Sequence, residues 1–182
     1  MSNLKIEGRL RVYAVPEGMV QRDVPGDAIT RMCECVMDNR NLIVNSGLDW
    51  VATKLGHGLG TPPVQVGGQT ITSIADLIVS KMKVGNASSP AAPAPGDTAL
   101  ADPSPLVTLS TITVSYPTAS SVRFRATIPI NTQNGQGLTE LGLFCTINSV
   151  DVLIGRLLFN PVTVVVPGTA YQLDYDISCS AI

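Results

Sequence analysis

The sequence predicts a mainly β protein, an antiparallel β-sandwich or jelly-roll-like domain with one or two short α-helices near its N-terminal third. From residue 107 onward, apolar and polar residues alternate in at least five segments, spaced about ten residues apart and separated by turn residues. Two segments with helical spacing lie before residue 83. No internal repeat is visible along the chain.

The composition suits one domain, with or without appendages. The chain has 182 residues, and its hydrophobic content of 45% excludes disorder of the whole chain. Twelve Lys and Arg against 14 Asp and Glu give a net charge of −2, which argues against a basic surface that binds nucleic acid. No apolar run approaches the roughly 18 residues of a membrane span, and residues 1–10 lack a signal-peptide hydrophobic region. We therefore expect no nucleic-acid partner, no membrane partner and synthesis in the cytoplasm.

The first segment alternates as a half-buried strand. One face carries apolar residues and the other carries charged residues: Leu4, Ile6, Leu10 and Val12 against Lys5, Glu7, Arg9 and Arg11. Proline and glycine mark the loop that follows, and a second strand is expected over residues 31–37.

Two helices are expected next. Asn45 or Ser46 can cap the first, which ends at Gly56. Its apolar stripe comprises Leu48, Val51, Ala52 and Leu55. Thr72 or Ser73 can cap the second, whose buried stripe comprises Ile74, Leu77, Ile78 and Met82.

The rest of the chain is expected to be a surface segment followed by strands. Residues 88–105 contain five prolines, which indicates an extended surface segment. Alternation or dense apolar runs then predict strands over residues 112–116, 122–130, 141–147, 152–159, 162–166 and 171–179.

No residue pattern matches a known catalytic or metal-binding arrangement, so we expect no enzyme, no cofactor and no metal. His57 is the only histidine and lies between glycines, without a serine elbow or a nearby acid. Asp174 and Asp176 can ligate a cation or simply form the wet face of a strand. The four cysteines lack zinc-site spacing, and we expect four free thiols: Cys33, Cys35, Cys145 and Cys179.

Two charges stand inside apolar strands. Glu140 precedes Leu-Gly-Leu-Phe, and Arg156 lies within the run at residues 153–159. A buried carboxylate and a buried guanidinium both need partners, so the sequence predicts a structural ion pair between Glu140 and Arg156.

An ordered set of short motifs runs through residues 41–179. It comprises Asn-Leu-Ile-x-Asn-x-Gly-x-x-Trp at 41–50, Met-Lys-Val-Gly-Asn at 82–86, Asp-Thr-x-Leu at 97–100, the alternating strand 122–128, an Asn-Gly loop, Glu-Leu-Gly-Leu-Phe at 140–144, Gly-Arg-x-x-Phe at 155–159 and a terminal Tyr-x-Leu-x-Tyr-x-Ile strand. In this order the chain resembles the small tail-fibre, tail-collar or baseplate-associated proteins of tailed bacteriophages.

That resemblance implies a β-rich virion protein that oligomerises, often as a trimer, and joins fibres or other virion components without catalysis. The expected partners are other tail, fibre, neck or capsid proteins, and the expected location is the virion. A capsid decoration or head-fibre protein is an alternative, because its fold and composition can be identical. A receptor- or glycan-binding module is a second alternative.

The resemblance begins near residue 41, so the chain divides into an N-terminal strand or arm at 1–40 and a β-rich domain at 41–182. The strand with Leu4, Ile6, Leu10 and Val12 can pair within its own sheet. It can instead add to a neighbouring subunit and act as an attachment strand.

Overall fold

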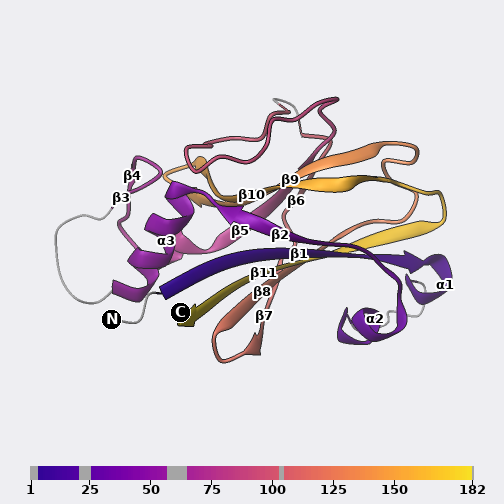
Figure 1. Cartoon of the computed structure of the whole chain (residues 1–182), viewed down its shortest axis with the longest axis horizontal. Helices are drawn as coiled ribbons and strands as arrows, with labels where there is room; N and C mark the ends of the chain where they lie inside the picture. The colour runs from indigo at the N-terminus through magenta and orange to yellow at the C-terminus, as the bar shows by residue number, and fades with distance from the viewer. Residues whose placement is uncertain (1–3, 21–25, 57–64, 103–104, 182) are drawn as a thin grey trace.

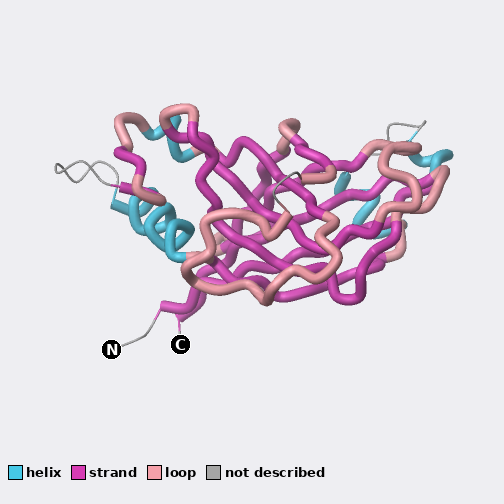
Figure 2. The backbone as a smooth tube through the Cα atoms, turned by 90° about the horizontal axis from the view of Figure 1, so that it is seen from above, coloured by secondary structure: helices cyan, strands magenta, loops and turns pink. Residues whose placement is uncertain are grey.

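The structure is a computed structural model that describes residues 4–20, 26–56, 65–102 and 105–181. It is mainly β, with 54% of residues in strands and 14% in helices, which confirms the predicted fold class. Strands make up most of the structure, and the helices lie at opposite ends of the molecule (Figure 2).

Nine strands form one antiparallel sheet in the order β6-β5-β9-β10-β2-β1-β11-β8-β7. Their bounds are β1 Leu4–Pro16, β2 Cys35–Ile43, β5 Val79–Gly85, β6 Val107–Leu109, β7 Thr113–Thr118, β8 Ser121–Ile128, β9 Gly137–Ile147, β10 Val150–Val164 and β11 Thr169–Ala181. A small separate hairpin joins β3, Gln65–Val66, to β4, Gln69–Thr70.

The sheet folds over at β2. This strand pairs with β1 over residues 35–41 but with β10 only at Leu42 and Ile43. The half with β5, β9 and β10 therefore lies over the half with β1, β11 and β8 (Figure 1). The hydrophobic core lies between the two halves and takes residues from both, among them Leu10, Val12, Phe124, Tyr175, Met82, Leu141, Leu143 and Ile154.

Helix α3, Asn45–Gly56, begins and ends as predicted, but its buried face differs. Trp50 and Val51 are each 7% exposed, whereas Leu48 is 43% exposed. The Trp50 indole N–H donates to the Leu77 carbonyl at 2.8 Å, which fixes the rotation of the helix. The predicted stripe was therefore wrong at Leu48.

The predicted second helix is only one 3₁₀ turn, η1, over Ile74–Leu77. Ser73 caps it as one of the two predicted candidates, and the Asp76 side chain completes the capping box. Ile78 is already extended and 57% exposed, and Met82 lies buried in β5. Alternation over residues 79–84 therefore overrides the helical spacing.

The predicted strand at residues 31–37 was wrong in its first part. Helix α2 covers Gly26–Met32, after the short helix α1, Glu17–Val20. Asp27 in the first turn of α2 and Arg31 in its last turn complement the helix dipole. Strand β2 begins at Cys35 and continues to Ile43.

Most strands from residue 107 onward lie close to their predicted positions, but β6, Val107–Leu109, lies outside the predicted ranges, and two predicted runs are joined. The runs at 152–159 and 162–166 belong to a single strand, β10, whose pairing with β9 shifts between Leu158 and Thr163.

The proline-rich segment contains no strand or helix over its described part, residues 88–102 and 105, as predicted. It also packs on the sheet. Leu100 is buried in a second apolar cluster with Val44, Phe144 and Leu153. Hence this segment covers the outer side of β9 and β10.

Residue 40 does not separate an arm from a domain. Strand β1 lies between β2 and β11, and β2 itself spans Cys35–Ile43. The start of β1 and the end of β11 lie side by side, because Leu4 pairs with Ala181 (Figure 1).

Candidate functional site

The strand considered for attachment is an interior strand of its own sheet. It pairs with β11 along its whole length and with β2 over residues 8–13. Leu10 and Val12 are fully buried in the core, and Ile6 packs against it. Leu4 lies in β1, but its side chain is outside the described residues. Since β11 pairs with all of β1, and β2 pairs with its other edge over residues 8–13, own-sheet pairing is the arrangement present.

Glu140 and Arg156 lie against each other on adjacent strands, β9 and β10. The Arg156 Nε donates to Glu140 Oε2 at 2.9 Å, and Nη2 lies 2.9 Å from the same oxygen. The two side chains are 0% and 4% exposed. Each charge therefore supplies the partner that the other needs in the protein interior.

The proline-rich segment completes this cluster. The backbone N–H groups of Ala101 and Asp102 donate to the Glu140 carboxylate at 3.0 and 2.7 Å. In return, Arg156 donates to the Asp97 carboxylate at 2.8 Å and to the Ala91 carbonyl at 3.1 Å. The buried charges thus fasten the segment to the sheet.

Asp97 is the member of this cluster that sequence reasoning missed. Burial acts to raise its pKa, but the Ala94 N–H and the Arg156 guanidinium outweigh burial and lower the pKa below its usual value. The sequence signal that pointed toward Asp97 is an acidic residue within a proline-rich stretch, in the Asp-Thr-x-Leu motif at 97–100.

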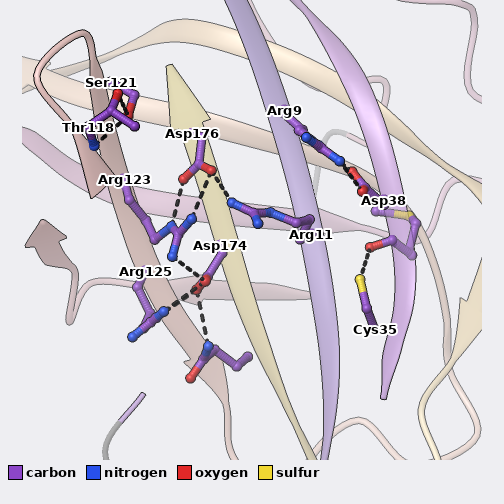
Figure 3. A network of polar contacts seen from close by, with 12 residues as sticks. Arg9, Arg11, Cys35, Asp38, Thr118, Ser121, Arg123, Arg125, Asp174 and Asp176 are labelled. Atoms are coloured by element: carbon purple, nitrogen blue, oxygen red, sulfur yellow. Dashed lines mark hydrogen bonds and ion pairs between the residues drawn. The ribbon is translucent and has the colours of Figure 1, made fainter. Parts of the chain in front are cut away.

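A second polar cluster covers the outer face of β1, β8 and β11 (Figure 3). Arg125 donates two hydrogen bonds to the Asp174 carboxylate, from Nε at 2.7 Å and from Nη2 at 2.8 Å. Arg123 donates hydrogen bonds from the same two atoms to Asp176, at 2.7 and 3.0 Å. These pairs are direct cross-strand partners in the register of β8 and β11. Arg11 also contacts Asp176.

This arrangement resolves the alternatives left open for the two aspartates. Asp174 is fully buried rather than on a wet face, and both carboxylates are used by arginines. The hydrogen bonds that Arg123 donates to Asp176, and that Arg125 donates to Asp174, raise the pKa of both guanidinium groups. Among the described residues, no three His, Cys, Asp or Glu side chains are grouped as metal ligands require.

The four thiols are free, as predicted. Cys145 is buried, Cys33 and Cys179 are half-buried, and Cys35 is exposed. His57 lies outside the described residues. None of the helices in the described ranges is both long and apolar enough to span a bilayer.

The last strand of the sheet, β7, has an open side. It pairs with β8 and is the terminal strand in the sheet order. Val114 and Tyr116 on this strand are 44% and 78% exposed. We call the outer side of Thr113–Thr118 the β7 edge surface. Sequence alternation predicted the strand, but not its place at the end of the sheet.

Comparisons with protein-family models, curated proteins and solved structures find no match to this chain.

Proposed function

We propose that this chain is a non-enzymatic structural protein of a tailed-bacteriophage virion, which docks through the β7 edge surface. The occupant that we propose for this surface is a second copy of the chain, and the assembled copies then connect tail, fibre or neck components. The observation that carries the proposal is an edge strand with exposed apolar side chains and an unpaired side.

Soluble proteins usually protect a sheet edge with charges, proline, bulges or short strands. Strand β7 has Pro117 and an irregular register between Ser115 and Thr118, but no charged residue. Tyr116 is 78% exposed beside this edge, and tyrosine is among the residues enriched in protein interfaces. An added strand would cover both the edge and this side chain.

The charge pattern favours a second copy as the occupant. No charged residue stands between Asp102 and Arg123, in a chain whose charged content is only 14%. Two copies of such a segment meet without like-charge repulsion, and no ion has to lose its water.

The ordered motifs of residues 41–179 support the virion setting, since they resemble fibre, collar and baseplate-associated proteins. That resemblance makes a trimer the expected assembly. A decoration or head-fibre role on the capsid is the alternative, because it uses the same kind of interface.

The experiment is to replace Val114 and Tyr116 together with lysine and to measure mass by light scattering and sedimentation. The wild type is expected to be an oligomer, and the double variant a monomer with an unchanged circular dichroism spectrum. Leu48→Lys with Ile78→Lys is the matched control, because these two apolar side chains are 43% and 57% exposed elsewhere. A monomeric wild type, or an oligomer that survives the β7 change, contradicts the docking proposal.

Quantitative mass spectrometry of purified particles tests the virion role separately. A tail position predicts few copies per particle, whereas decoration predicts copies over the whole shell. Absence from the particles contradicts both.

A further inference from the structure

A cavity opens on the outer face of the sheet, beside the arginine–aspartate cluster. Its volume is about 420 Å³, and β6, β7, β8, β11 and α2 all contribute to its wall. Ligand cavities for small molecules are usually about 300–1,000 Å³, so this one suits a ligand at the small end of that range.

The wall is rich in uncharged hydrogen-bonding groups. Five hydroxyl side chains line it: Thr108, Ser110, Thr111, Thr113 and Thr127. Gln172, which is 1% exposed, and Arg125 also line it. Hydroxyl groups both donate and accept hydrogen bonds, which suits a ligand with several hydroxyls of its own.

Arg125 lines the cavity and is held by a buried carboxylate. The fully buried Asp174 fixes Nε and Nη2 at 2.7 and 2.8 Å. Among the described residues, the partner of the remaining nitrogen, Nη1, is Asp27 of α2 at 3.1 Å, whose side chain is 78% exposed. An ion pair with so exposed a partner contributes little free energy and is easily exchanged.

The charges of the cluster leave room for one more anion. Arg11, Arg123 and Arg125 face the strand carboxylates Asp174 and Asp176, which gives 3 − 2 = +1 before Asp27 is counted. Asp27 supplies the balancing carboxylate from outside. A carboxylate on a ligand can therefore take its place and form a charge-assisted hydrogen bond with Nη1.

We propose that this cavity binds a small polyhydroxylated carboxylic acid of the sugar-acid class, with its carboxylate on Arg125 and its hydroxyls on the threonine and serine side chains. Asp27 occupies the carboxylate position in the free protein and is displaced on binding. The cavity shares Thr113 with the β7 edge surface, but its ligand is a small molecule and the proposal does not depend on docking at β7.

The test is titration of the whole protein with sodium glucuronate, followed by two-dimensional NMR at matched ionic strength. We expect saturable shifts of the Arg125 Nε–H signal and of amides at residues 110–113 and 125–127. Glucose, which lacks the carboxylate, should bind at least about tenfold more weakly, as for the loss of a charge-assisted hydrogen bond. Asp27→Asn should tighten binding about two- to fivefold, the change expected when a competing exposed ion pair is removed.

A blocking variant locates the site. Thr127→Trp fills the cavity from an exposed position on β8 and should abolish the shifts, whereas Ala119→Trp at the exposed β7–β8 turn should leave them unchanged. Thermal melts of both variants verify that they fold. Absence of saturable shifts in the wild type, equal binding of glucose, or undiminished binding by a folded Thr127→Trp variant overturns the proposal.

Discussion

Tyr171 and Tyr175 of β11 are both buried, yet their hydroxyl groups differ in hydrogen bonding. The Tyr171 hydroxyl donates to the Val164 carbonyl at 3.2 Å and accepts from the Val166 N–H at 3.1 Å. Among the described residues, the Tyr175 hydroxyl has no hydrogen-bond partner. Burial also raises the pKa of Tyr175 far above its ordinary value, so the group stays neutral.

The two tyrosines make a matched pair of substitutions. On folding, the Tyr175 hydroxyl loses its hydrogen bonds to water and gains none from the described residues. Tyr175→Phe should therefore leave the free energy of unfolding unchanged or raise it by about 1 kcal/mol. Tyr171→Phe should lower it by about 1 kcal/mol, because two hydrogen bonds are lost. Urea denaturation measures both values. A larger loss for Tyr175→Phe than for Tyr171→Phe would show that the buried hydroxyl has a stabilising partner.

Arg156 is expected to contribute more to stability than an exposed arginine. Arg156→Leu leaves the Glu140 carboxylate buried with only backbone N–H partners, and should cost about 3–5 kcal/mol. Arg9→Leu is the control, since Arg9 and Asp38 are 54% and 39% exposed and their pair contributes about 0–1 kcal/mol. Equal losses in denaturation experiments would mean that the Glu140–Arg156 pair is solvated.

Asp151 should make stability depend on pH in acid. Burial alone would raise its pKa, but hydrogen bonds from Lys81, Lys83 and Thr146 outweigh burial and lower the pKa to about 2. A lowered carboxyl pKa stabilises the folded state above the unfolded pKa of about 4, and this contribution disappears as pH falls toward 2. The stability difference between wild type and Asp151→Asn should therefore shrink across that interval. A difference that stays constant from pH 5 to about 2 would contradict the expectation.

At the scale of elements, helix α3 packs on β10 so closely that Gly47 allows no side chain. A Cβ atom at this position would lie 1.9 Å from the Ile154 carbonyl oxygen. Gly47→Ala should therefore push the helix off the sheet and cost about 3 kcal/mol or more. Gly18→Ala in α1 is the control, because nothing lies within 4 Å there and alanine favours the helix. Equally small decreases in melting temperature for Gly47→Ala and Gly18→Ala would contradict the close approach.

Local patterns predicted elements well where one signal dominated. Alternation located β8, β9 and β11, and the start predicted at Asn45 or Ser46, together with Gly56, located α3. The rotation of α3 was not predictable, because its contact with Leu77 joins residues 27 positions apart. Likewise, burial in the sheet decides that Met82 belongs to a strand, although its spacing from Ile78 also fits a helix.

The candidate sites were predictable only in part. Glu140 and Arg156 each lie inside an apolar run, and a buried charge needs a partner of opposite sign. Their contact could therefore be predicted from the sequence. Asp97 joins them from 59 residues before Arg156, through a segment whose path depends on tertiary contacts. The burial of Asp174 could not be predicted for a related reason. Alternation shows which face of the strand a residue takes, but not what covers that face.

At the scale of the whole molecule, strand order separates sequence neighbours and joins distant segments. Strand β1 pairs with β11, the last strand of the chain, and β2 links the two halves of the sheet. No local signal specifies such long-range pairing. The first 40 residues, which the motif resemblance leaves out, therefore contribute two adjacent strands to the middle of the sheet.

Deletion of residues 1–13 is the decisive test of that arrangement. It removes Leu10 and Val12 from the core and leaves β2 and β11 each with an unpaired edge. Burial of each such side chain contributes about 1.5–3 kcal/mol, against a total stability of about 5–15 kcal/mol for a typical domain. The lost pairing adds to this, so the shortened chain should fail to fold, with Trp50 fluorescence shifted to that of a solvated indole. Deletion of residues 1–3 keeps all of β1 and should leave the spectrum unchanged. A cooperative, native-like unfolding transition after the longer deletion would mean that β1 is dispensable, and would restore the hypothesis of an attachment strand.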